Sequence, residues 1–152
     1  MLKAKVTIMT ITLSLVLFSA TLFAKGNSET GITGMYSDMC YNDEGDDLLG
    51  MEVFLVYADS MDADSYYVCF QNSEGAAEAP TVIKATVNEK KMTVDFVFPK
   101  DSSLAGMKFH GVIKKDGMRV NIKGAGGAGV ENEWLKKQPS YWEHRDRDCK
   151  KN

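Results

Sequence analysis

The 152 residues contain few of the side chains that carry most enzyme chemistry, with two histidines, three cysteines and three prolines in all. His110 and His144 both stand among charged residues, as surface side chains do, and leave little material for a histidine-based catalytic or metal site. No serine lies in a G-x-S-x-G motif, and Cys69 lies between Val68 and Phe70 in a strand-like pattern. We therefore expect no catalytic residue, no metal ligand and no cofactor.

Basic charge is also in short supply, with 18 lysines and arginines against 21 acidic residues and a formal net charge of −3. If residues 1–24 are removed, two lysines and no acidic residue are lost, and the net charge becomes −5. Proteins that bind nucleic acid present a basic surface to the phosphates. The sequence therefore predicts no nucleic-acid partner.

The N-terminus does contain a long apolar run. Lys3 and Lys5 precede residues 6–23, which carry no charge, and polar residues return after Ala24. This order is typical of a cleavable secretory signal peptide over residues 1–24. The alternative is an uncleaved membrane anchor, since the run approaches the roughly 20 residues that span a bilayer. We predict cleavage, which leaves 25–152 as a single domain with a short charged C-terminal tail and no membrane anchor.

Export predicts a location in the periplasm of a bacterium or outside the cell, where thiols tend to form disulfides. Cys40, Cys69 and Cys149 all belong to the mature part, so one thiol is left over. Three pairings are open, as is a state in which all three are reduced. We favour Cys40 with Cys69, because Cys149 lies in a highly charged tail near the end of the chain.

The mature sequence alternates apolar and polar residues with a period of two, which is typical of half-buried antiparallel strands. Asp116-Gly117 lies between two such stretches and predicts a tight hairpin, because both residue types tolerate positive φ. The predicted strands cover residues 35–41, 48–58, 65–71, 81–87, 92–98, 107–114, 118–123 and 133–142, the last interrupted or ended by Pro139.

Seven or eight strands joined by short polar turns, without an amphipathic helix, predict an all-β antiparallel meander. Such a meander has to cover its apolar face and its edges. We favour closure into a small β-barrel, with a β-sandwich as the alternative. The strand 48–58 is apolar on both faces, so we expect one face to lie under a loop, a partner or a chain terminus.

The segment Ile32-Thr33-Gly34-Met35-Tyr36 opens the first strand, and Trp142 lies near the end of the meander. This layout resembles the calycin-type barrels, the lipocalin and avidin relatives, with Tyr36 at the position of their usual tryptophan. The resemblance implies a barrel with a ligand-sized interior. It carries over no binding residue, and a separate family of small exported β-domains fits the same pattern.

Two motifs have ligand-binding counterparts elsewhere. Residues 124–129 fit G-x-G-x-x-G after a strand, but a dinucleotide loop needs a following helix in a βαβ unit, so we interpret them as a loop. The acidic turns 42–47 and 59–64 offer oxygen atoms for calcium, yet neither has the spacing of a known calcium loop. We interpret both as solvated hairpin turns.

Aromatic residues are the better guide to binding, because their rings supply contact area together with a polar tip. Our candidate ligand- or partner-binding residues are Tyr36, Tyr57, Tyr66, Tyr141 and Trp142. We hypothesise an exported, non-enzymatic binding protein that takes a small ligand in the barrel or an envelope protein at its end loops. The alternatives are an inhibitor or accessory protein of an enzyme such as lysozyme, and a hydrolase that uses loop carboxylates.

Overall fold

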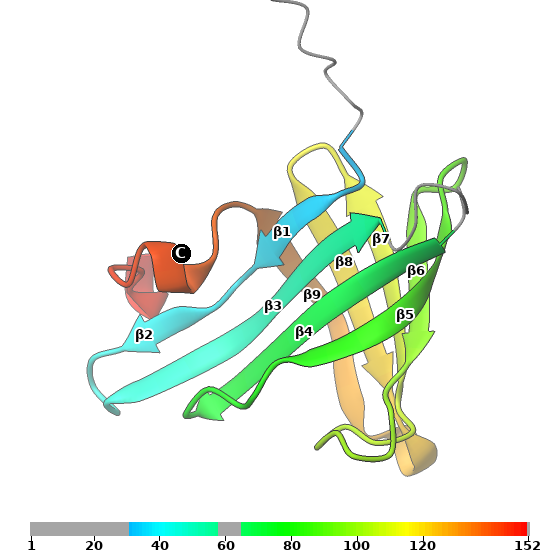
Figure 1. Cartoon of the computed structure of the whole chain (residues 1–152). Coiled ribbons are helices and arrows are strands. Elements are labelled where there is room, and N and C mark those ends of the chain that lie inside the picture. The colour runs from blue at the N-terminus through cyan, green and yellow to red at the C-terminus, as the bar shows by residue number, and fades with distance from the viewer. Residues whose placement is uncertain (1–30, 58–64, 152) are drawn as a thin grey trace, which may run out of the picture. The chain divides into compact units, whose positions relative to one another are not determined.

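The computed structural model describes residues 31–57 and 65–151, which belong to one structural unit. These residues form nine β-strands and three single-turn 3-10 helices (Figure 1). The strands are β1 (Gly34–Ser37), β2 (Cys40–Asn42), β3 (Asp47–Tyr57), β4 (Ser65–Gly75), β5 (Thr81–Asn88), β6 (Thr93–Val97), β7 (Lys108–Lys114), β8 (Gly117–Lys123) and β9 (Gly129–Lys137). The helical turns are η1 (Ala125–Gly127), η2 (Tyr141–Glu143) and η3 (Cys149–Lys151).

Eight of the strands close into an antiparallel barrel. From β3 to β9 each strand pairs with the next, and β1 pairs with both β3 and β9 and so completes the ring. The short strand β2 pairs with the first residues of β3 and extends beyond the barrel. The predicted all-β meander and its closure as a barrel are confirmed, and the sandwich alternative is wrong.

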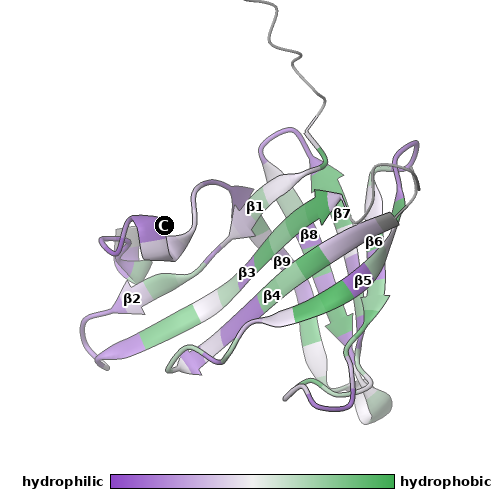
Figure 2. Cartoon of the chain, viewed as in Figure 1, coloured by the Kyte–Doolittle hydropathy of each residue, from purple (hydrophilic) through white to green (hydrophobic). Residues whose placement is uncertain are grey.

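The alternating pattern explains the core. In β5, for example, Ile83, Ala85 and Val87 are buried while the residues between them are exposed. The interior is filled by aliphatic side chains and by the rings of Phe70, Phe96, Phe98 and Phe109, which contact one another edge-on or stacked. Figure 2 shows hydrophobic and hydrophilic residues alternating along the strands, and further hydrophilic residues in the turns and in the C-terminal segment.

Three predicted strands differ from the structure by more than one residue, and one of these, 65–71, continues to Gly75. The predicted strand 35–41 is interrupted at Asp38 and Met39, although β1 and β2 pair with β3 in the same register. The predicted final strand 133–142 begins four residues earlier and ends at Lys137, before Pro139. Residues 58–64, which include the second acidic turn, lie outside the described residues.

The hairpin between β7 and β8 is confirmed, but the reason given for it is wrong. The two turn residues are Lys115 and Asp116, and Gly117 is the first residue of β8. A Cβ atom on Gly117 would lie 2.4 Å from the Leu135 carbonyl oxygen and 2.5 Å from the Trp134 ring. The glycine is needed there because β9 passes so close to it.

The predicted Cys40–Cys69 disulfide is also wrong, because Cys40 is bonded to Cys149 and Cys69 is a free thiol. Cys40 lies opposite Leu49 on β3, and Cys69 lies opposite Phe54. Five residues of strand separate these positions by about 16 Å, whereas a disulfide needs Cα atoms within about 7 Å. The charged tail reaches Cys40 instead, because it folds back beside β1 and β2 (Figure 1).

Candidate functional site

A buried carboxylate holds residues 138–151, the C-terminal segment that we call the tail, against the outer wall of the barrel. Glu52 belongs to β3 and is only 4% exposed. One of its oxygens accepts hydrogen bonds from the Ser37 hydroxyl at 2.9 Å and the Tyr141 N–H at 2.5 Å. The other accepts from the Ser140 hydroxyl at 2.7 Å. These donors come from β1 and from the tail, so one side chain joins three segments of the chain.

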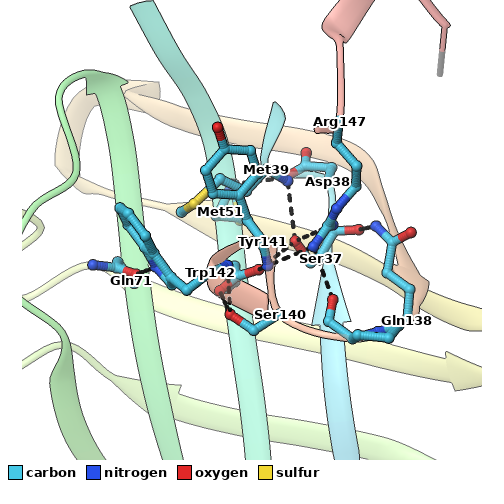
Figure 3. Close-up of polar contacts among 12 residues, drawn as sticks. Ser37, Asp38, Met39, Met51, Gln71, Gln138, Ser140, Tyr141, Trp142 and Arg147 are labelled. Carbon is cyan, nitrogen blue, oxygen red and sulfur yellow. Dashed lines mark hydrogen bonds and ion pairs between the residues drawn. The ribbon is translucent and has the colours of Figure 1, made fainter. Parts of the chain in front are cut away.

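Arg147 completes this cluster from the far end of the tail. Its guanidinium lies 3.8 Å from Glu52, donates to the Ser37 hydroxyl at 3.2 Å and donates to the Pro139 carbonyl at 2.9 Å. Figure 3 shows Ser37, Ser140, Tyr141 and Arg147 converging from the strand and the tail. The expectation that a chain terminus covers one face of the strand 48–58 is confirmed around Leu48 and Glu52 only, since Phe54 on the same face is 41% exposed.

Beside this cluster, the wall of the barrel opens into a cleft of about 340 Å³, which we call the side cleft. It is lined by Ser37, Asp38, Glu133, Trp134, Lys136 and Gln138. It lies beside the short contact between β1 and β9, which pair at only two positions before β1 ends at Ser37. The other neighbour of β9 is β8, and the pairing of these two strands shifts near Asn132, which has φ of 60°.

Asp38 lies in an environment that disfavours its charged form. Burial raises the pKa of its carboxyl to about 6, with smaller increases from the charges of Glu133 and Glu52. The Met51 N–H, which donates to Asp38 at 2.6 Å, acts in the opposite direction. The side cleft therefore holds a carboxyl that changes its charge near neutral pH, a property often found in functional sites.

A second concavity, the mouth pocket, lies at the end of the barrel where β6 connects to β7 and β8 to β9. Its volume is about 210 Å³. Apolar side chains from three strands and from the β6–β7 connection provide most of its lining, and Asn72 and Glu74 add polar groups. The lining residues are Met51, Asn72, Glu74, Leu104, Met107, Ile122, Gly129 and Val130. The glycine-rich segment 124–129 forms the neighbouring β8–β9 connection, as expected of a loop.

The five aromatic residues predicted to bind lie in separate places. Tyr36 and Tyr66 are buried among the core residues, and the half-exposed Tyr57 stacks on Tyr66 with ring centroids 4.7 Å apart. Tyr141 belongs to the tail and is buried against Met39 and Leu48. Trp142 is 42% exposed and donates its indole N–H to Gln71 at 2.7 Å. They form no single site.

Trp142 stands near an exposed apolar strip on the outer wall. Met35, Phe54, Cys69 and Val82 lie opposite one another on four adjacent strands, and we call them the outer apolar row. Phe54 is 41% exposed and Val82 67%. Exposed apolar patches mark interaction surfaces more often than single apolar residues do.

Apart from Tyr141, the residues that make the side cleft and the Glu52 cluster were not predicted. Glu52 had a visible signal, since it is the one acidic residue within the apolar stretch 48–57. Asp38 and Glu133 had none, because they are 95 residues apart and meet only through closure of the barrel. Trp134 was overlooked among the aromatic residues.

Within residues 31–57 and 65–151, no group of three or more potential ligand side chains could hold a metal ion. No helix in this part of the chain is both long enough and apolar enough to cross a bilayer. Comparisons with protein-family models, with curated proteins and with solved structures found no match.

Proposed function

We propose that this chain is an exported binding protein that takes a small, mainly apolar ligand in the mouth pocket. The observation that carries this proposal is a concave, largely apolar surface at one end of a barrel whose interior is otherwise filled. Ligand sites are typically of this kind, with a few polar groups that orient the ligand. The resemblance to calycin-type barrels and the Cys40–Cys149 disulfide, which is compatible with an oxidising compartment, support the same proposal.

The filled core limits both the position and the size of the ligand. Phe70, Phe96 and Phe98 pack against one another inside the barrel, so the ligand occupies the mouth and does not penetrate to the centre. A volume of 210 Å³ equals that of about seven liquid water molecules. A single ring or a short alkyl chain fits this space, and its polar end would face Asn72 and Glu74 at the rim.

The test is a titration with the neutral apolar dye N-phenyl-1-naphthylamine, followed by displacement with hexanol. The phenyl ring of the dye is small enough for the pocket, and its naphthyl group would project from the mouth. We expect saturable fluorescence in the folded protein. Leu104 is a half-buried residue of the pocket lining, and Leu104→Arg should weaken binding at least about tenfold, because it places a charge against apolar surface. Val82→Arg adds the same charge on the outer apolar row and should leave binding unchanged.

Two other outcomes would contradict binding in the mouth pocket. If Val82→Arg removes dye binding and Leu104→Arg does not, the dye binds to the outer wall. If neither substitution matters, the fluorescence comes from non-specific surface. Thermal unfolding of both variants without dye shows whether they are folded.

The outer apolar row supports a second candidate function, the binding of an envelope protein. Phe54, Val82 and the neighbouring Tyr67 are all substantially exposed on adjacent strands, and aromatic residues are enriched at protein interfaces. A protein retained from envelope extract by the natural chain and lost with Val82→Arg would support this function. No retained protein at low salt would remove it.

A further inference from the structure

We propose that the side cleft binds a neutral polyhydroxylated ligand, a saccharide, separately from the mouth pocket. Its lining combines carboxylates, an amide, an amine and an indole from β1, β9 and the residues directly after them, where the barrel closes. At 340 Å³ it has the volume of about eleven liquid water molecules. One sugar ring with part of a second fits this space.

The signs of the charges decide the class of ligand. Asp38 and Glu133 both line the cleft, so an anionic ligand would face two carboxylates. Lys136 lines it as well, so the lining contains charges of both signs and matches neither a purely anionic nor a purely cationic ligand. A ligand with neutral hydroxyl groups matches both signs of charge, because a hydroxyl donates to a carboxylate and accepts from an ammonium.

The cleft is also held in shape before any ligand binds. Gln138 donates to the Ser37 carbonyl at 2.7 Å, and the Met51 N–H holds one Asp38 oxygen at 2.6 Å. Ser37 donates to the buried Glu52. These bonds fix the wall formed by β1, and a preorganised site loses less entropy on binding.

Trp134 provides the apolar part of the lining. Its ring lies against Gly117, and the Arg119 guanidinium lies 4.8 Å from the ring centroid. The C–H groups of a sugar ring pack against indole while its hydroxyl groups turn toward polar side chains. Trp134 therefore complements the carboxylates in the way that an amphipathic sugar ring requires.

The chain contains two tryptophans, and this allows an internal control. In the nitrogen-15 NMR spectrum, the indole N–H of Trp134 reports on the side cleft and that of Trp142 on the tail. The probes are methyl β-glucoside, maltose and N,N′-diacetylchitobiose, each titrated to 50 mM. We expect a saturable shift of the Trp134 signal with at least one sugar, while the Trp142 signal stays in place.

Two matched variants test the lining. Glu133→Ala removes a carboxylate of the cleft and should weaken sugar binding about tenfold. Glu131→Ala removes an equal charge from the same strand, at an exposed residue paired with Lys123, and should have no effect. Leu104→Arg should also leave sugar binding intact, which separates this proposal from the mouth pocket.

Three results would overturn the proposal. The first is no movement of the Trp134 signal with any of the three sugars. The second is a lack of specificity. It would show either as equal movement of both indole signals or as equal weakening of sugar binding by Glu133→Ala and Glu131→Ala. The third is a response to methylguanidinium chloride but not to the sugars, which would make the cleft a cation site.

Discussion

Burial of the Glu52 carboxylate costs desolvation free energy, and three hydrogen bonds and the Arg147 guanidinium compensate for this cost. Removing one partner of a buried ion pair costs about 3 to 5 kcal/mol, because the other partner is left without compensation. We expect Glu52→Ala to lower the free energy of unfolding by about 3 kcal/mol, measured by urea denaturation. Glu52→Gln keeps an acceptor oxygen for the tail and should cost less.

The control for this prediction is Glu131→Ala. The Glu131 carboxylate pairs with Lys123 at 3.2 Å with both side chains exposed, and such a pair contributes less than about 1 kcal/mol. Similar losses for Glu52→Ala and Glu131→Ala would mean that the buried cluster adds nothing to stability.

Asp38 should make the protein less stable as the pH rises from 4 to 7. Its carboxyl keeps a proton up to about pH 6 in the folded state and loses it near 3.8 when unfolded. The folded state therefore binds more protons in this window, so stability falls with increasing pH. Asp38→Asn removes the titration and still offers Met51 an acceptor. We expect the stability difference between the natural chain and this variant to change by up to about 2 kcal/mol.

This change is measured by comparing denaturation curves of the two proteins at several pH values. The comparison cancels the other carboxylates, which titrate in both proteins. Parallel curves, or an NMR titration that places the Asp38 pKa below 4.5, would contradict the assignment.

At the scale of elements, the far end of the C-terminal segment is attached to β2 by a disulfide and a backbone hydrogen bond. The Cys40–Cys149 disulfide closes a loop with a sequence separation of 109 residues, and the Tyr41 N–H donates to the Arg147 carbonyl at 2.7 Å. A loop of this length contributes about 4 to 5 kcal/mol in the chain-entropy account. We expect the double substitution Cys40→Ser with Cys149→Ser to lower stability by several kcal/mol and to expose residues 138–151 to proteases.

Limited proteolysis with mass spectrometry measures this exposure, and Cys69→Ser is the matched control. Cys69 makes no disulfide, and its half-buried position on β4 should allow substitution at a cost of about 1 kcal/mol or less. Mass spectrometry of the unreduced natural chain should find one disulfide between residues 40 and 149. A peptide that links residues 40 and 69 would contradict the fold of the tail.

The same elements show which features could be predicted from the sequence. The strands follow from local alternation, because burial of every second residue depends on the strand itself and its immediate neighbours. The disulfide depends on the path of the tail after Lys137, and local sequence patterns do not predict that path. Gly117 was assigned to a turn because Asp-Gly has that preference, whereas its actual requirement is the close approach of β9.

The side cleft escaped prediction for a reason that belongs to the whole molecule. Its walls come from the first and last strands of the barrel, β1 and β9, and no sequence pattern sets how completely the ends of a meander meet. Ten residue pairs join β3 to β4, but only two join β1 to β9. The closure of the ring is therefore its thinnest connection, and the cleft lies directly beside it.

Because so few residue pairs join β1 to β9, we predict that the barrel opens between these two strands before it unfolds as a whole. In native-state hydrogen exchange, the Gln138 amide, which donates to the Met35 carbonyl, should exchange through a local opening. The amides of Val53 and Val68, in the middle of β3 and β4, should exchange only with global unfolding. Equal protection of all three would contradict a weak closure. A sugar that bridges Asp38 and Glu133 spans the same seam, so its binding should slow exchange at Gln138 and leave Val68 unchanged.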